Sequence, residues 1–239
     1  LLWRADVADL VAARVILTEH DHAFAGRPPL EARLAVTVGG AEEELIVVVV
    51  HMKAGAGAED RDRRAQAGAA LKAHLDAAWP DARVVVLGDL NDDLDASIVP
   101  GHTTPYAPFL DDPARWLAPT AALSAAGTPS TTGYPDPVDH QLHSNEAAAG
   151  TLEGSAAAVR LDTWIPAYDA TTSDHYPVVT ARTVTLRGAT YPLVLPSLRD
   201  PGHIDSAGRK RATGTQSTVA AGTTGTAGTT VCGGISGRG

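Results

Sequence analysis

Two polar residues that could handle a phosphate group follow an apolar run near the middle of the chain. The run from Val84 to Leu87 leads into Gly88, and Asp89 and Asn91 come directly afterwards. Consecutive β-branched and aliphatic residues are typical of a buried strand, so we expect Asp89 and Asn91 on a loop at its end. A carboxylate and an amide in one small space offer acceptors to a hard cation and a donor to a phosphate oxygen. The pattern therefore indicates phosphate chemistry, although the same residue types also form ordinary turns.

A histidine occupies the corresponding place after an earlier apolar run. His51 follows the run from Leu45 to Val50. A helix over about residues 63–79 is predicted between the two runs, with Pro80 ending it. The apolar face of this helix consists of Ala67, Leu71, Leu75 and Ala78. A strand, a helix and a second strand predict a right-handed crossover, in which the parallel strands end at one edge of the sheet. We therefore expect His51 and Asp89 on a common rim.

Further candidate residues lie later in the chain. Asp139 stands near the start of a predicted strand at residues 138–144, and Asp174 and His175 directly precede another strand, which runs to about Thr185. Residues that precede a strand reach this rim only if the strand runs opposite to the parallel pair, so we expect a mixed sheet. Residues 92–137 show little periodicity and predict a surface-lining loop region.

The first 38 residues predict two short strands, at residues 7–17 and 34–38. Between them, Pro28 and Pro29 hold the chain extended and leave Arg27 at the head of the stretch. A guanidinium at that place could meet a phosphate, and an arginine with no such role would look the same in the sequence.

Composition predicts one globular domain and a tail. The 239 residues are 44% hydrophobic, which is enough for a substantial core. We expect the domain at residues 1–187, a linker at 188–206 and a disordered tail at 207–239, where Gly, Thr, Ala and Ser dominate.

Charge and cysteine content narrow the function classes only slightly. A net charge of −9 argues against a broad basic surface for nucleic acid, yet an enzyme needs only a local basic groove and a metal. The single cysteine, Cys232, excludes an internal disulfide and leaves the compartment undetermined, with secreted and periplasmic locations both open. No apolar run reaches the length of a membrane span, and the absence of an initiator methionine predicts a fragment or a processed product.

Four motifs in this order resemble the endonuclease/exonuclease/phosphatase superfamily, which includes pancreatic-type deoxyribonuclease. The motifs are His51-Met52-Lys53, Gly88-Asp89-Leu90-Asn91, Val138-Asp139-His140 and Ser173-Asp174-His175-Tyr176-Pro177, and Arg27-Pro28-Pro29-Leu30 is similar less specifically. The resemblance implies an α+β fold, a mixed β-sheet sandwich flanked by helices, as in deoxyribonuclease I. It also implies metal-dependent hydrolysis of phosphodiesters.

The resemblance assigns the proton-transfer roles to three residues. It makes His175 the general base for the attacking water, oriented by Asp139 or a neighbouring carboxylate, and it gives Asp89 the positioning of that water.

Substrate and metal binding fall to the other members of the set. The resemblance implies that Asn91 and His51 hydrogen-bond the phosphoryl oxygens, with Arg27 as a further substrate contact. Asp174 would help to bind a divalent cation, Mg²⁺ or Mn²⁺.

Nucleic acid is the leading substrate under this resemblance, with an endonuclease or exonuclease activity. Phospholipid headgroups, as for sphingomyelinases, and inositol phosphates are the alternatives, because one scaffold supports all of these activities. The sequence leaves the oligomeric state open.

One departure from the family pattern concerns the N-terminal half. The family supplies an early Asn and a metal-binding Glu, whereas this chain has no Asn before Asn91, and Glu19 and Glu31 lie outside any matching motif. The resemblance covers about residues 1–182, so we expect a truncated member that lacks the N-terminal half. Such a chain would leave the inner face of its sheet exposed, aggregate readily and be inactive alone.

Two other interpretations stay open from the sequence. One is a zinc hydrolase that takes its metal ligands from His20-Asp21-His22 and Asp139-His140-Gln141-Leu142-His143. This interpretation is disfavoured because His140 and His143 are three residues apart, and on a strand such residues point to opposite faces. The other is a non-enzymatic interaction module or an inactive relative.

Overall fold

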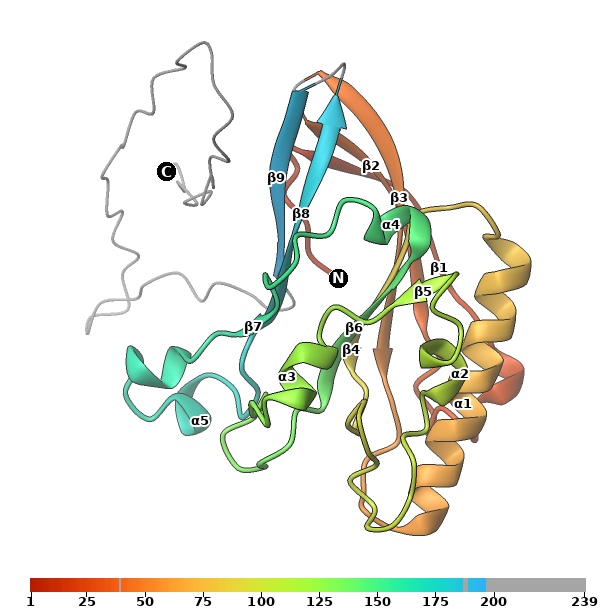
Figure 1. Cartoon of the computed structure of the whole chain (residues 1–239), viewed down its shortest axis with the longest axis vertical. Helices are drawn as coiled ribbons and strands as arrows, with labels where there is room; N and C mark the ends of the chain where they lie inside the picture. The colour runs from red at the N-terminus through yellow and green to blue at the C-terminus, as the bar shows by residue number, and fades with distance from the viewer. Residues whose placement is uncertain (39, 187–188, 197–239) are drawn as a thin grey trace.

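The computed structural model describes residues 1–38, 40–186 and 189–196, which form two β-sheets with flanking helices (Figure 1). The strands of the larger sheet are β1 (Ala8–Val15), β2 (Leu30–Val38), β3 (Ala41–His51), β4 (Val84–Asp89), β5 (Trp116–Leu117) and β6 (Asp139–Ser144). The strands of the smaller sheet are β7 (Ala157–Ala158), β8 (Val178–Leu186) and β9 (Ala189–Pro196). The tail predicted at residues 207–239 lies outside the described residues.

One long helix and several short ones complete the fold. They are α1 (Ala58–Ala78), α2 (Ala107–Leu110), α3 (Ala121–Ala125), α4 (Asn145–Ala148) and α5 (Tyr168–Thr171), with 3₁₀ turns η1 (Thr18–His20) and η2 (Leu161–Thr163). Within the described ranges, no helix has the length and apolar character needed to cross a bilayer.

The predicted crossover is confirmed. The larger sheet has the order β1-β2-β3-β4-β6-β5, in which β3 and β4 are parallel and every other neighbouring pair is antiparallel. The sheet is therefore mixed, as predicted. In α1, the residues Ala67, Leu71 and Leu75 are buried as expected. Ala78 is exposed, whereas Trp79, directly after the helix, packs against the core.

Alternation along β3 and β4 divides the core between the two faces of the larger sheet. Ile46 and Val48 pack with α1, whereas Leu45 and Val47 lie on the other face with Val85. All five side chains are buried. The expected exposed inner face is therefore only partly present, because Ala147 of α4 packs against it. Two further residues of this face, Val49 and Leu87, are only partly buried.

We had expected the strand that follows His175 to join the larger sheet, and this prediction is wrong. This strand, β8, pairs with β7 and β9 instead, beside the inner face of the larger sheet (Figure 1). The Thr180 hydroxyl donates to Gln141 Oε1 at 2.7 Å and so connects β8 to β6. A sequence pattern identifies a strand but not its hydrogen-bonding partner, which explains the error.

Two segment assignments also need correction. Strand β9 occupies residues 189–196, inside the predicted linker, whose other residues lie outside the described part of the chain. Residues 92–137 hold α2, α3 and β5, and they bury Leu94, Tyr106 and Phe109 in the main core. These elements are two to five residues long, which is too short to show a periodicity in the sequence.

Near the N-terminus, β1 lies within the predicted range, but β2 begins at Leu30, four residues before the predicted start. Leu30 follows directly after the two prolines, which cannot donate to a β-ladder. Arg27 therefore sits just ahead of a strand, at the same end of the sheet as the end of β3, since Leu30 pairs with Val49.

Candidate active site

Three neighbouring strands bring the predicted residues to one rim of the larger sheet. His51 ends β3, Asp89 ends β4 and Asp139 begins the antiparallel β6, so that His51 pairs with Asp89 and Asp89 with Asp139. Asp89 is thus the last residue of the strand, whereas we had predicted that it lies on the loop. Gly88 is required beside it, because an added Cβ would lie 2.0 Å from the Val50 carbonyl oxygen.

His175 reaches this rim from the loop before β8 and pairs with Asp139. Its Nδ1 lies 2.8 Å from Asp139 Oδ2. An ionised carboxylate only accepts hydrogen bonds, so Nδ1 carries a proton and Nε2 is the atom available to take one. The same Asp139 oxygen accepts a hydrogen bond from Ser130 Oγ at 2.7 Å.

This pairing has a strong electrostatic effect. The hydrogen bond that His175 donates to Asp139, together with the charges of Asp139, Asp89 and Asp174, raises the pKa of His175 to about 9, against an opposing effect of burial. The imidazole is therefore a strong proton acceptor at the rim.

Asp89 and Asn91 form a compact unit. The Asn91 backbone N–H donates to Asp89 Oδ1 at 2.8 Å, and its amide Nδ2 donates to Asp89 Oδ2 at 2.8 Å and to the Met52 carbonyl at 3.1 Å. Asn91 has a φ of 53°, a left-handed conformation that asparagine tolerates better than most residues. Burial and the charge of Asp139 raise the pKa of Asp89 to about 6.

Arg27 and His51 lie together at the open side of the rim. Arg27 Nη1 lies 2.9 Å from His51 Nε2, and Arg27 Nη2 donates to the Met52 carbonyl at 2.9 Å. His51 Nε2 also lies 3.4 Å from Asp89 Oδ2, and the His51 side chain is 52% exposed. Burial and the positive charge of Arg27 lower the pKa of His51, which favours a neutral imidazole that accepts from the guanidinium.

A buried ion pair supports the loops behind these residues. Arg64 of α1 and Asp92 are both 0% exposed and lie 2.8 Å apart. Arg64 also donates to the carbonyls of Lys53 and Gly55, while Asp92 accepts from the Ile98 backbone at 2.8 Å. Sequence reasoning missed this pair. One signal was available, because Arg64 lies on the same helical stripe as the buried residues of α1.

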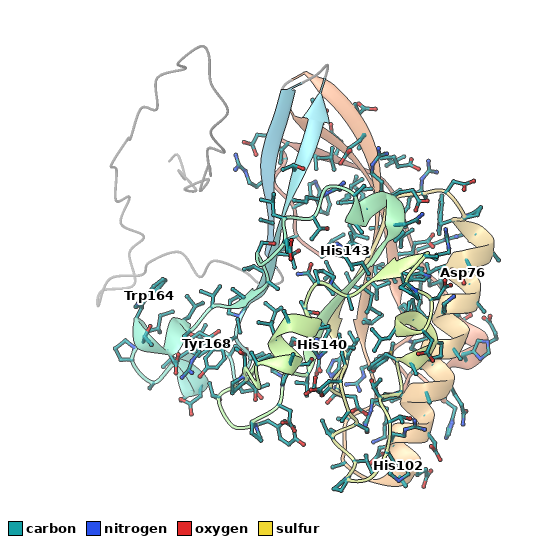
Figure 2. All side chains as sticks on the ribbon, viewed as in Figure 1. Asp76, His102, His140, His143, Trp164 and Tyr168 are labelled. Atoms are coloured by element: carbon teal, nitrogen blue, oxygen red, sulfur yellow. The ribbon has the colours of Figure 1, made fainter. Side chains whose placement is uncertain are left out.

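The segment that leads to His175 is anchored by tyrosines. The Tyr168 hydroxyl donates to the His175 carbonyl at 2.7 Å, and the rings of Tyr168 and Tyr176 stack 5.8 Å apart. Figure 2 shows Trp164 on the outer side of this segment, away from the larger sheet, and its side chain is 75% exposed. The tyrosines hold the His175 backbone, whereas Trp164 contributes nothing to that packing.

The described residues do not form a complete metal site. None of their His, Cys, Asp and Glu side chains gather in threes in a way that could hold an ion. Asp89 is bonded to Asn91, and Asp139 to His175 and Ser130. Asp174, our predicted metal ligand, is exposed, and its charge acts on His175. The described residues thus offer an ion no group of three such ligands, and a Mg²⁺ ion here would take most of its oxygen ligands from water and from the substrate phosphate.

Two histidines of the zinc alternative, His140 and His143, are used elsewhere, and the other two, His20 and His22, are exposed. His140 is buried between the Thr120 hydroxyl and the Pro137 carbonyl, and His143 lies between Thr151 and Gln141. Burial lowers the pKa of His140 to about 4 and that of His143 to about 3. Both are neutral core residues with separate partners.

Comparison with known proteins gives one family match. The sequence profile described as "Endonuclease/Exonuclease/phosphatase family" matches residues 1–175. No curated protein matches the chain by sequence.

Several solved structures are similar to this fold. The catalytic domain of human Nocturnin with bound sulfate is 19% identical, with a TM-score of 0.46, and the alignment covers 72% of this chain and 58% of that one. A humanized D. rerio TDP2 is 15% identical, with a TM-score of 0.48 and coverages of 72% and 64%. An endonuclease/exonuclease/phosphatase from Beutenbergia cavernae is 18% identical, with a TM-score of 0.47 and coverages of 81% and 53%. The chain spans less than two thirds of each of these proteins.

Proposed function

The chain belongs to the endonuclease/exonuclease/phosphatase family of phosphoester hydrolases, and from this premise we propose that it hydrolyses a phosphodiester by water attack at the rim of the larger sheet. The observation that carries the proposal is the 2.8 Å contact between His175 and Asp139, placed beside Asp89 on the adjacent strand.

In this proposal His175 is the general base. Asp139 holds the imidazole with Nδ1 protonated, so Nε2 can take a proton from water as the water attacks phosphorus. The nearby carboxylates stabilise the imidazolium that forms, which supports a strong base. Asp89 orients the water through its carboxylate.

Arg27, His51 and Asn91 are the proposed substrate contacts. A guanidinium has five N–H donors, and Arg27 uses only some of them on His51 and Met52, so others can meet a phosphate oxygen. Asn91 has both amide hydrogens engaged with Asp89 and Met52. It can therefore reach a phosphoryl oxygen only by exchanging one of these bonds.

A divalent cation, Mg²⁺ or Mn²⁺, remains part of the proposal because family members are generally metal-dependent. Asp174 is our proposed contribution from this chain, as an exposed carboxylate next to His175. Since the described residues do not complete a site, no step of the reaction is assigned to the metal.

Nucleic acid is the proposed substrate class. The open rim presents Arg27 and the His51 imidazole, and these suit the phosphodiester that nucleic acids share with some phospholipids. An acidic chain with a local basic contact is compatible with such a substrate, provided that the contact area is small.

The test is hydrolysis by the full 239-residue chain of plasmid DNA, sphingomyelin and bis-(4-nitrophenyl) phosphate, each with Mg²⁺ and with a chelator. The departure from the family pattern predicted that the chain would be inactive alone. Because the rim residues come together within this chain, we expect instead that it cleaves diesters, with DNA as the preferred substrate and loss of cleavage on chelation. Preference for sphingomyelin would replace the substrate class. Absence of cleavage of all three substrates would contradict the proposed function of this chain.

A further inference from the structure

Ser130 is a fully buried residue, 0% exposed, that no motif in the sequence singled out. Its Oγ lies 2.9 Å from the Val138 backbone N, 3.1 Å from the Asp139 backbone N and 2.7 Å from Asp139 Oδ2. The hydroxyl thus contacts both the start of β6 and the side chain of the residue that pairs with His175.

The direction of these bonds follows from chemistry. A backbone N–H can only donate, so the two amides occupy the acceptor positions of the hydroxyl. The single hydroxyl proton must then go to Asp139 Oδ2, which cannot donate when ionised. This same oxygen also accepts from His175 Nδ1 at 2.8 Å. Ser130 therefore holds the carboxylate oxygen that orients the imidazole.

The backbone of the same segment holds the other partner. Tyr176 N donates to the Ser130 carbonyl at 2.7 Å, and Thr132 N donates to the Asp174 carbonyl at 2.8 Å. Thr131, which lies between Ser130 and Thr132, forms an antiparallel β-bridge with His175. One short segment thus fixes Asp139 through a side chain and the His175 loop through main-chain bonds.

We infer that Ser130 is a positioning residue for the Asp139–His175 pair, in which its hydroxyl locks the Asp139 carboxylate in the orientation that receives the His175 imidazole. Its importance for catalysis rests on the proposed function, but the locking itself does not. Without the hydroxyl, the carboxylate can rotate away, and His175 loses the contact that makes it a strong base.

The primary test follows the hydrogen bond from His175 Nδ1 to Asp139 directly, through the NMR signal of the Nδ1 proton in the full chain without substrate. Ser130→Thr and Ser130→Val form a matched pair, because they differ by a hydroxyl in place of a methyl group, and Ser130→Ala is a second hydroxyl-free variant. We expect the Thr variant to keep the downfield, exchange-protected Nδ1 proton of the wild type. In the Val and Ala variants this signal should be lost through exchange with water.

Ser97→Ala is the control for a general loss of hydrogen bonds. The Ser97 hydroxyl donates to Asp92 Oδ2 at 3.0 Å and accepts from Val99 N at 3.1 Å, so it has the same kinds of partner without contacting His175. We expect this variant to melt at a lower temperature and to leave the His175 Nδ1 proton signal unchanged.

Three results would overturn the inference. They are an unchanged His175 Nδ1 proton signal in a folded Val or Ala variant, an equal loss of this signal in Ser97→Ala, and failure of both hydroxyl-free variants to fold, which would make Ser130 a structural residue. The two proposals fail separately: loss of the Nδ1 proton signal in Ser130→Val, in a chain that cleaves no diester, would reject the proposed function and keep the role of Ser130. If the chain is active, adding Ser130→Val to the His175→Ala variant should slow the residual reaction by less than a factor of about two, because Ser130 acts through His175.

Discussion

The dipeptide Asp-His occurs three times in the chain, and the structure uses two of the copies, Asp139-His140 and Asp174-His175, in opposite ways. His175 lies at the rim and pairs with Asp139 of the other dipeptide, whereas His140 is buried between Thr120 and Pro137. Their pKa values move apart, to about 9 for His175 and about 4 for His140. The comparison teaches that a histidine becomes a base or a neutral core residue according to what faces it and not according to its sequence neighbour.

The largest expected effect comes from removing the rim histidine. His175→Ala should lower turnover by roughly two to four powers of ten, the usual scale for a lost general base, with little change in fold. Steady-state rates on the preferred diester provide the measurement. His102→Ala is the matched control, because His102 is exposed and lies apart from His140, whose sequence neighbour Asp139 pairs with His175 (Figure 2). A loss below tenfold in His175→Ala would assign the base to another residue.

The buried histidine should appear in acid stability. His140 has a folded pKa depressed to about 4, so the unfolded chain binds a proton between pH 6.5 and 4 that the folded chain does not. Its contribution to stability is therefore present above pH 6.5 and is lost as the pH falls through this window, by on the order of 3 kcal/mol.

Urea unfolding of the wild type and His140→Gln between pH 4 and 7 would measure this term. The raised pKa values of Asp89 and Asp93 oppose it in both proteins, so only the difference between the two curves isolates His140. Parallel pH dependences would show that His140 does not titrate on unfolding in this range.

The rim histidine should dominate the pH dependence of activity. With a pKa of about 9, His175 is mostly protonated at pH 7, and its basic form increases roughly tenfold per pH unit up to that value. We expect kcat/KM to rise between pH 7 and about 9 and then to level off. A profile that falls over this range would indicate that His175 donates a proton and does not accept one.

The smallest effect is expected at Asp174, the acidic residue that directly precedes His175 in the sequence. Asp174→Asn removes one of several negative charges that raise the His175 pKa, so that pKa should fall only slightly and the rate should change by less than about tenfold. If Asp174 helps to bind Mg²⁺, the variant should also need more of the ion. A titration of rate against Mg²⁺ concentration checks this, and an unchanged requirement would remove Asp174 from the metal site.

The sequence by itself identified the strands and the rim to a large extent. The apolar runs before His51 and Asp89, with a helix between them, were enough to predict parallel strands that end together, because crossover connections obey a simple rule of handedness. The four motifs were enough to identify the family. Residues that are close in the sequence determine such patterns, so no distant contact is needed to interpret them.

Tertiary structure alone decided the remaining features, because they depend on which distant segments meet. Nothing near Ser130 in the sequence indicates that its hydroxyl would meet a carboxylate nine positions later, or that Arg64 and Asp92 would be buried together. The sheet that β8 joins, and hence the route by which His175 reaches Asp139, also follows from long-range packing. Hydrogen-bond partners and burial are properties of the folded arrangement, and these set the opposite pKa shifts of His175 and His140.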